Sequence, residues 1–169
     1  MKVFFDTEFL EDGQTIDLIS VGMIREDGKT LYRVSSEFNE RRALRNEWIA
    51  ENVLKDKIVM GEQRYTRTQI AADILEYLAD VEKPEFWAYV GAYDWVALCQ
   101  LYGPMVARPS GWPTYCRDLK QVTDRLNMKP REQLGLKHHA LLDAVWVRES
   151  YDSIRQFCIK NLHPMACPV

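Results

Sequence analysis

The sequence is poor in cysteine and histidine, the residues that most often build zinc sites and disulfide frameworks. It contains four cysteines and three histidines among 169 residues. The cysteines form no CxxC pair and no matching histidine pattern accompanies them, which excludes a zinc ribbon or a thioredoxin-like redox motif. We interpret all four as reduced, structural thiols: Cys99, Cys116, Cys158 and Cys167.

Long apolar runs are also missing. Residues 95–107 contain no Asp, Glu, Lys or Arg, but this stretch includes Gly103 and Pro104 and is too short to cross a bilayer. A secretory signal needs an apolar segment near the start of the chain, and Asp6 and Glu8 interrupt it. We therefore expect a cytoplasmic protein that makes no contact with a membrane.

The chain has no excess of basic residues. It has 22 Lys and Arg against 25 Asp and Glu, a formal net charge of −3, which argues against a broad nonspecific coat of nucleic acid. Any nucleic-acid contact is therefore expected to be local. Because a content of 47% hydrophobic and 28% charged residues is ordinary for a globular protein and no repeat divides the chain, we predict one domain over residues 1–169.

The order of apolar patterns predicts an α/β domain. Three strands come first, because apolar, β-rich runs at the start of the chain, over 16–24 and over 31–34 follow one another closely, with Asp27-Gly28 marking a hairpin turn. Strands that alternate with helices then follow, so the expected sheet is mixed and covered by helices. The later elements are predicted as helices over 40–54 and about 66–78, a strand over 86–90, a helix from Asp94, a helix over 115–126, a loop over 127–137 and a long final helix from residue 138 or 140.

The stretch VFFDTEFL, residues 3–10, ends an apolar strand with two carboxylates. Asp6 and Glu8 are separated by one residue, so their side chains point to the same face of an extended chain. At ~6–7 Å and an effective dielectric near 20, they repel by roughly 2–3 kcal/mol unless water, a proton or a cation intervenes. Two solvated carboxylates would also explain the pattern. However, α/β sheets bind ligands at the carboxyl ends of buried strands, which makes both acids candidate site residues.

Two later stretches carry further candidates. In VGAYDWVAL, Asp94 enters a helix after a strand and a glycine, where a carboxylate is also favourable on electrostatic grounds alone. In LKHHALLDAVWV, His139 and Asp143 are four residues apart and share a helical face. His138 and Asp143 reach one site only if His138 lies on the loop that approaches the helix. Periodicity by itself therefore favours His139, and a histidine near a helix start is more often structural than catalytic.

Taken together and in order, these stretches match a known set of motifs. They are Asp6-Thr-Glu8, Asp94 and His138-x-Ala-x-x-Asp143-Ala. The set resembles the DEDDh superfamily of 3′-5′ exonucleases over nearly the whole chain, and the size is similar to ribonuclease T, oligoribonuclease and the small exoribonucleases of the AS type. One position departs from the pattern, because Val90 stands where the middle motif often has Asn. The resemblance implies an RNase H-like mixed sheet of about five strands flanked by helices.

The resemblance also implies a chemistry. Four carboxylates would hold two divalent ions, Mg²⁺ or Mn²⁺, because oxygen ligands and a phosphate substrate suit these metals better than zinc. They are Asp6, Glu8, Asp94 and Asp143. His138 would accept the proton of the attacking water, so that RNA with a free 3′ end is shortened and nucleoside 5′-monophosphates are released. Phe9 and Leu10 would contact the terminal base, and the protein would form a homodimer.

Other functions are open at this stage. A DNA-directed 3′-5′ exonuclease would use the same residues, because these groups contact phosphates, which carry no sequence information. An apolar strand that ends in Asp-Thr is also similar to the nucleophile strand of haloacid dehalogenase phosphatases, but these need a second Asp where Glu8 stands. A catalytically inert nucleic-acid-binding module is disfavoured, because buried charge without a function is costly.

Overall fold

The structure, a computed structural model, describes residues 1–54 and 61–161, so Cys167 lies outside the described residues. None of the helices in this part of the chain is long and apolar enough to span a membrane. The elements in chain order are β1 (Lys2–Glu11), β2 (Ile16–Arg25), β3 (Thr30–Ser35), α1 (Glu40–Ala43), α2 (Glu47–Ile49), the π-helical turn η1 (Ala50–Leu54), β4 (Arg64–Tyr65), α4 (Arg67–Tyr77), β5 (Glu85–Ala88), α5 (Ala92–Gln100), the 3-10 turn η2 (Met105–Ala107), β6 (Arg117–Asp118), α6 (Leu119–Arg125) and α7 (Ala140–Asn161).

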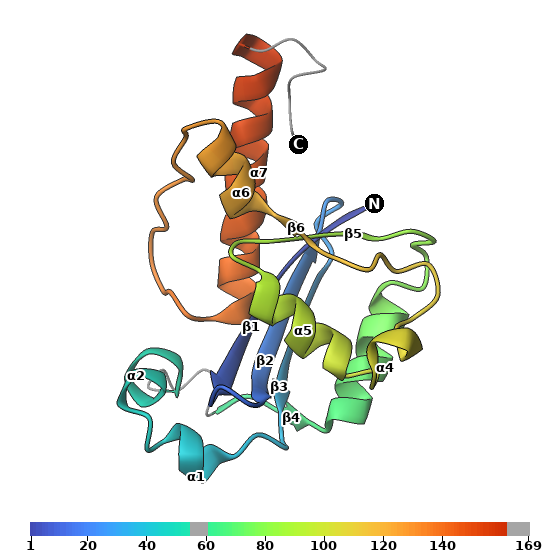
Figure 1. The fold of residues 1–169 in the computed structure, drawn as a ribbon, viewed down its shortest axis with the longest axis vertical. Coiled ribbons are helices and arrows are strands. Elements are labelled where there is room, and N and C mark those ends of the chain that lie inside the picture. The colour runs from blue at the N-terminus through green and yellow to red at the C-terminus, as the bar shows by residue number, and fades with distance from the viewer. Residues whose placement is uncertain (55–60, 162–169) are drawn as a thin grey trace.

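The centre of the domain is a six-stranded sheet in the order β4-β3-β2-β1-β5-β6 (Figure 1). Strands β1, β2 and β3 pair antiparallel, as predicted, and the other neighbours pair in parallel. This arrangement confirms the predicted α/β class and its RNase H-like mixed sheet. The resemblance implied about five strands, and the apolar pattern predicted four. It missed β4 and β6 because these have two residues each, too few to show the alternation that marks a strand.

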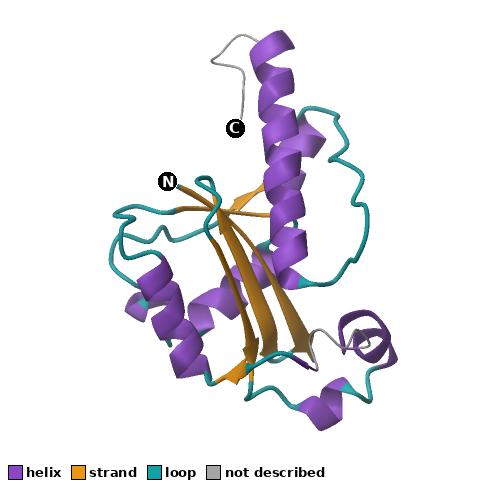
Figure 2. Ribbon diagram, turned by 180° about the vertical axis from the view of Figure 1, so that it is seen from behind, coloured by secondary structure: helices purple, strands orange, loops and turns teal. Residues whose placement is uncertain are grey.

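The two faces of the sheet pack against different helices (Figure 2). On one face, Phe5 of β1 lies in an apolar cluster with Ile74 of α4 and Leu98 of α5. On the other face, Phe4 packs with Tyr151 of α7, with ring centroids 5.1 Å apart. Because successive strand residues point to opposite faces, both sides of β1 are buried, which explains its continuous apolar run.

Two predicted helices differ from the structure. Residues 40–54 do not form one helix, because the Asn46 side chain accepts the Ile49 N–H at 3.1 Å and starts a new helical segment. The helix predicted over 115–126 begins only at Leu119, because residues 117–118 pair with β5 and the Asp118 side chain caps the helix. Both predictions were wrong for the same reason, since a capping side chain inside an apolar pattern does not disturb the periodicity.

Helix α7 comes very close to the sheet at Gly22 of β2. A Cβ atom at this position would lie 2.2 Å from the backbone nitrogen of Leu141 and 2.3 Å from the carbonyl carbon of Ala140. Only glycine permits this approach. Gly22 pairs with Asp6 of β1, so the missing side chain allows the first turn of α7 to lie beside the acidic part of β1.

We predict that Gly22→Ala lowers both stability and activity. The added methyl group must displace backbone atoms of α7, and overpacking of this kind costs roughly 1–3 kcal/mol, or a few degrees in Tm at about 2–4 °C per kcal/mol. Thermal unfolding followed by circular dichroism measures the loss. Gly61→Ala is the matched control, because a Cβ atom there meets nothing within 4 Å. Equal Tm values for the two variants would contradict the close approach.

Candidate active site

Asp6 and Glu8 lie in the middle of β1, which continues to Glu11, so they do not end the strand as the sequence predicted. They share the face of Phe4, which packs against α7, because strand side chains alternate. Their partners in β2 are Gly22 and Ser20. On the other edge, the pairing of β1 with β5 ends at Phe4. Beyond Phe4, the backbone of β1 on that edge is therefore available to form hydrogen bonds with groups from another element.

Asp94 of α5 occupies this edge. It lies in the first turn of the helix and is 7% exposed. Its Oδ1 atom accepts the backbone N–H of Thr7 at 2.9 Å and the Thr7 hydroxyl at 2.6 Å. The carboxylate thus satisfies a backbone donor that a neighbouring strand would otherwise pair. These bonds fix Asp94 beside the strand that carries the other two acids.

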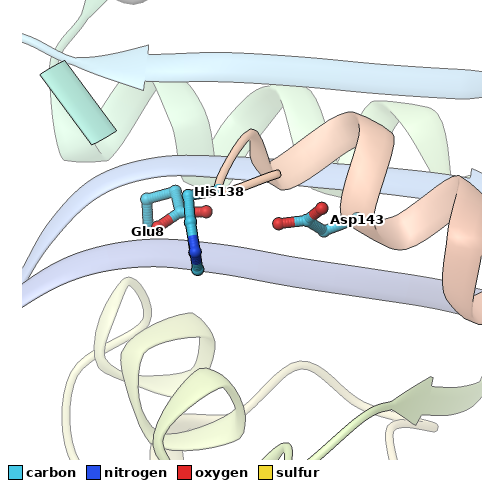
Figure 3. Close-up of side chains that lie close together, drawn as sticks. All are labelled: Glu8, His138 and Asp143. Carbon is cyan, nitrogen blue, oxygen red and sulfur yellow. The ribbon is translucent and has the colours of Figure 1, made fainter. Parts of the chain in front are cut away.

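His138 and Asp143 come from the start of α7 (Figure 3). His138 lies two residues before the helix with φ 60, a left-handed conformation that few non-glycine residues adopt. One ligand atom from each of Glu8, His138 and Asp143 lies within 4.8 Å of the others. His138 therefore lies on the loop that leads into α7. The spacing in the sequence required this position for His138 to reach the same site as Asp143.

The four acids influence one another strongly. Burial, followed by repulsion from Asp94, Glu8 and Asp143, raises the pKa of Asp6 well above its usual range. Burial, with Asp143 and then Asp94, raises the pKa of Glu8 to about 8. The pKa values of Asp94 and Asp143 are also raised, and burial is again the largest cause. Acids that are distant in the sequence thus share one poorly solvated site.

The donor set fits a hard divalent cation. Within residues 1–54 and 61–161, no Lys or Arg forms an ion pair with any of the four acids. Buried carboxylates without a counter-charge are costly. Carboxylate oxygens are the ligands that Mg²⁺ and Mn²⁺ prefer, and Glu8, His138 and Asp143 already lie close enough together to share an ion.

The two residues predicted to contact the base are placed differently. A β-bulge between Glu8 and Phe9 shifts the strand register. Phe9 stacks on Tyr93, with ring centroids 5.9 Å apart and an interplanar angle of 14°. Tyr93 immediately precedes Asp94 in the chain. Leu10 is 2% exposed and packs in a separate apolar cluster of the core. The structure therefore brings Phe9 to the site and does not bring Leu10 there.

His139 has a structural position. Its carbonyl oxygen accepts the Asp143 N–H at 2.9 Å, and its Nδ1 atom accepts the Leu142 N–H at 3.5 Å, so His139 caps α7. The ring is buried and stacks on Tyr32 of β3, with centroids 4.4 Å apart. Periodicity favoured His139 as the partner of Asp143. In the structure, His139 instead caps helix α7, and Asp143 lies in the first turn of that helix.

Val90 occupies a strained turn. It has φ 59 and is 57% exposed, and its N–H donates to Oδ1 of Asp118 at 3.0 Å. Asn adopts this left-handed conformation more readily than a β-branched residue. The DEDDh pattern often has Asn at this position. Val in place of Asn therefore puts a conformationally unfavourable residue four positions before Asp94.

This combination of fold and site defines a class. An RNase H-like sheet that gathers four acids and a histidine beside its first strand is the arrangement of a DEDDh-type nuclease, a hydrolase.

The comparisons agree with this class. Residues 1–154 match the 3′-5′ exoribonuclease Rv2179c-like domain, and the chain belongs to this family. It is 42% identical over 165 residues to 3′-5′ exoribonuclease Rv2179c of Mycobacterium tuberculosis strain H37Rv, an alignment that covers 93% of this chain and 91% of the relative. The 3′-5′ exoribonuclease MT2234.1 of strain CDC 1551 / Oshkosh gives the same values. The predicted resemblance and the enzyme class, a 3′-5′ exoribonuclease, are confirmed.

Four residues at the site were missed by the sequence reasoning. Gly22 had a signal, because an isolated glycine in a strand often marks a close backbone approach. Thr7 had a weak one, since it lies between two candidate acids. Trp48 of α2, which is 53% exposed and contacts the His138 ring edge-on with centroids 4.8 Å apart, had none. Gln133, which donates to Asp143, had none either, because only folding brings it there.

We predict that the metal-free protein loses stability as the pH rises. The folded state keeps a proton on Glu8 up to about pH 8, whereas its ordinary value is 4.5, so the folded state binds more protons over this window and the free energy of unfolding falls with pH. Added Mg²⁺ or Mn²⁺ binds the deprotonated acids of the folded state and restores stability.

Scanning calorimetry with chelator and with metal, between about pH 5 and about pH 9, measures both effects. The increase in Tm on adding metal should be larger at the alkaline end. Glu8→Gln is the control, because removing the titrating group should flatten the pH dependence. A metal-free Tm that rises across this window would contradict the shared buried charge.

We predict that His139→Ala mainly lowers stability. Loss of the cap costs about 0.5–2 kcal/mol, and His139→Asn should recover part of it because Asn is a favourable cap. Chemical denaturation measures the change, and turnover per folded molecule should remain close to that of the parent. A large loss of turnover at unchanged stability would mean that His139, not His138, has the catalytic position.

Proposed function

We propose that the protein shortens RNA from a free 3′ end, hydrolysing phosphodiester bonds with two bound divalent ions, Mg²⁺ or Mn²⁺, and releasing nucleoside 5′-monophosphates. The observation that carries this proposal is the convergence of Glu8, His138 and Asp143, whose ligand atoms lie within 4.8 Å of one another although the residues are far apart in the chain.

The chain's own acids would hold the ions. They are Asp6, Glu8, Asp94 and Asp143, whose pKa values are all raised by burial and, for Asp6 and Glu8, also by the other acids. When bound, two such ions clamp the scissile phosphate and stabilise the attacking and leaving oxygens of an in-line displacement. Because the acids are buried or partly buried and held by three different elements, little reorganisation is needed to bind a cation.

His138 is proposed as the general base. It lies beside Glu8 and Asp143 but outside helix α7, so its ring can face a water molecule near the acids. An imidazole can accept a proton near neutral pH, which suits removal of the proton from the attacking water. The edge-on contact with Trp48 limits the orientations open to the ring.

The stacked Phe9 and Tyr93 rings are proposed to contact the terminal base. Tyr93 is 54% exposed and immediately precedes Asp94, so a base that lies on this surface is close to the acids. Stacking on aromatic rings contributes roughly 1–3 kcal/mol per base and depends little on sequence. We also keep the homodimer, expected from the resemblance, as a proposal that the molecular mass in solution tests.

The test follows 5′-labelled single-stranded RNA and DNA of matched sequence with Mg²⁺ and then with chelator. We expect a metal-dependent ladder that shortens RNA from its 3′ end, with nucleoside 5′-monophosphates identified by chromatography. His138→Ala should lower turnover roughly 10²–10⁴-fold while calorimetry still detects metal binding. His139→Asn is the matched control, because it changes the neighbouring histidine and keeps a cap.

The alternatives give different results. Faster cleavage of the DNA oligomer would favour a DNA-directed 3′-5′ exonuclease. Tight RNA binding without cleavage would favour an inert nucleic-acid-binding module. Cleavage that persists in chelator, or products with 3′-phosphates, would overturn the proposed mechanism.

A further inference from the structure

The loop between α6 and α7, residues 126–139, is anchored on one side of α7. The Trp146 indole N–H donates to the Arg131 carbonyl oxygen at 2.8 Å. The Arg131 guanidinium lies 3.4 Å from the Glu149 carboxylate. Asp143, Trp146 and Glu149 follow one another at intervals of three residues, so they lie along one side of the helix. The loop is thus held against the helix that carries a proposed metal ligand.

This anchor places Gln133 on Asp143. Gln133 lies two residues beyond Arg131, and its Nε2 atom donates to Oδ1 of Asp143. A carboxylate oxygen can only accept, so the NH₂ group of the amide must face it. The same hydrogen bond lowers the pKa of Asp143 against the larger effect of burial.

Asp94 is held in a comparable way. One of its oxygens accepts both donors of Thr7, and one oxygen of Asp143 accepts Gln133. In both cases a donor from another element engages one oxygen of an acid that lies in the first turn of a helix. In both acids the second oxygen remains able to bind a cation, and in Asp143 one lone pair of the first oxygen does so too.

We infer that Gln133 is a positioning residue for the metal site, which orients Asp143 through one oxygen and is itself positioned by the contact between Trp146 and Arg131. The inference rests on the proposed function, because it takes Asp143 as a metal ligand. Outer groups that orient a ligand commonly change metal affinity 10–100-fold when they are removed.

The test compares Gln133→Met, which keeps the length of the side chain but has no donor, with Glu132→Ala, a change at the exposed neighbouring position. Mn²⁺ affinity is measured by calorimetry and Tm is measured in chelator. We expect Gln133→Met to bind Mn²⁺ roughly 10–100-fold more weakly, with an unchanged metal-free Tm, and to regain RNA cleavage at high Mn²⁺ concentration. Trp146→Phe, which removes only the indole N–H, should weaken Mn²⁺ binding in the same direction by a smaller factor.

Two results would overturn the inference. Parental Mn²⁺ affinity in Gln133→Met would show that the amide does not position Asp143, and tighter binding would show that it competes with the ion. Asp143→Asn separates this failure from failure of the proposed function. If Asp143→Asn abolishes Mn²⁺ binding while Gln133→Met does not change it, only the role of Gln133 is wrong. If Asp143→Asn binds Mn²⁺ as the parent does, the proposed ligand set is wrong.

Discussion

Mutual repulsion among acids gathered beside the middle of β1 is the constraint that the rest of the site must satisfy. Burial alone raises the pKa of each acid, and proximity adds to the shift for Asp6 and Glu8. A fold that gathers such groups must hold them against their electrostatic preference to separate. It does so with backbone packing next to the acids, above all the approach of α7 to Gly22, the strand partner of Asp6, where no side chain intervenes.

The four acids are held by three pieces of regular structure. Asp6 and Glu8 belong to a strand buried on both faces, Asp94 to the first turn of α5 and Asp143 to the first turn of α7. Two packed layers of helices fix these elements, because separate apolar clusters lie on the two faces of the sheet. Rigid elements give more reproducible ligand positions than loops, which is a general requirement for a site that orients a phosphate.

Two residues in unfavourable backbone conformations lie at the border of the site. Val90 and His138 have φ 59 and φ 60, values that cost non-glycine residues of order 1–3 kcal/mol. Val90 lies two residues before α5, and His138 lies two residues before α7. Such strain persists only where the surroundings enforce it. At His138 the enforcing contacts are the cap formed by the next residue and the edge of the Trp48 ring.

Local sequence determined much of this protein. The antiparallel strands, the strand and helix around Asp94 and the long final helix follow from periodicity and turn residues, which act over a few neighbouring positions. The position of Asp6 and Glu8 on an apolar strand made them candidates, whereas only the family resemblance pointed to His138, because periodicity alone favoured His139. Tertiary structure decided the rest. It buried Leu10, stacked the His139 ring on Tyr32 and brought Gln133 to Asp143, since each outcome depends on contacts between residues that the sequence pattern does not relate.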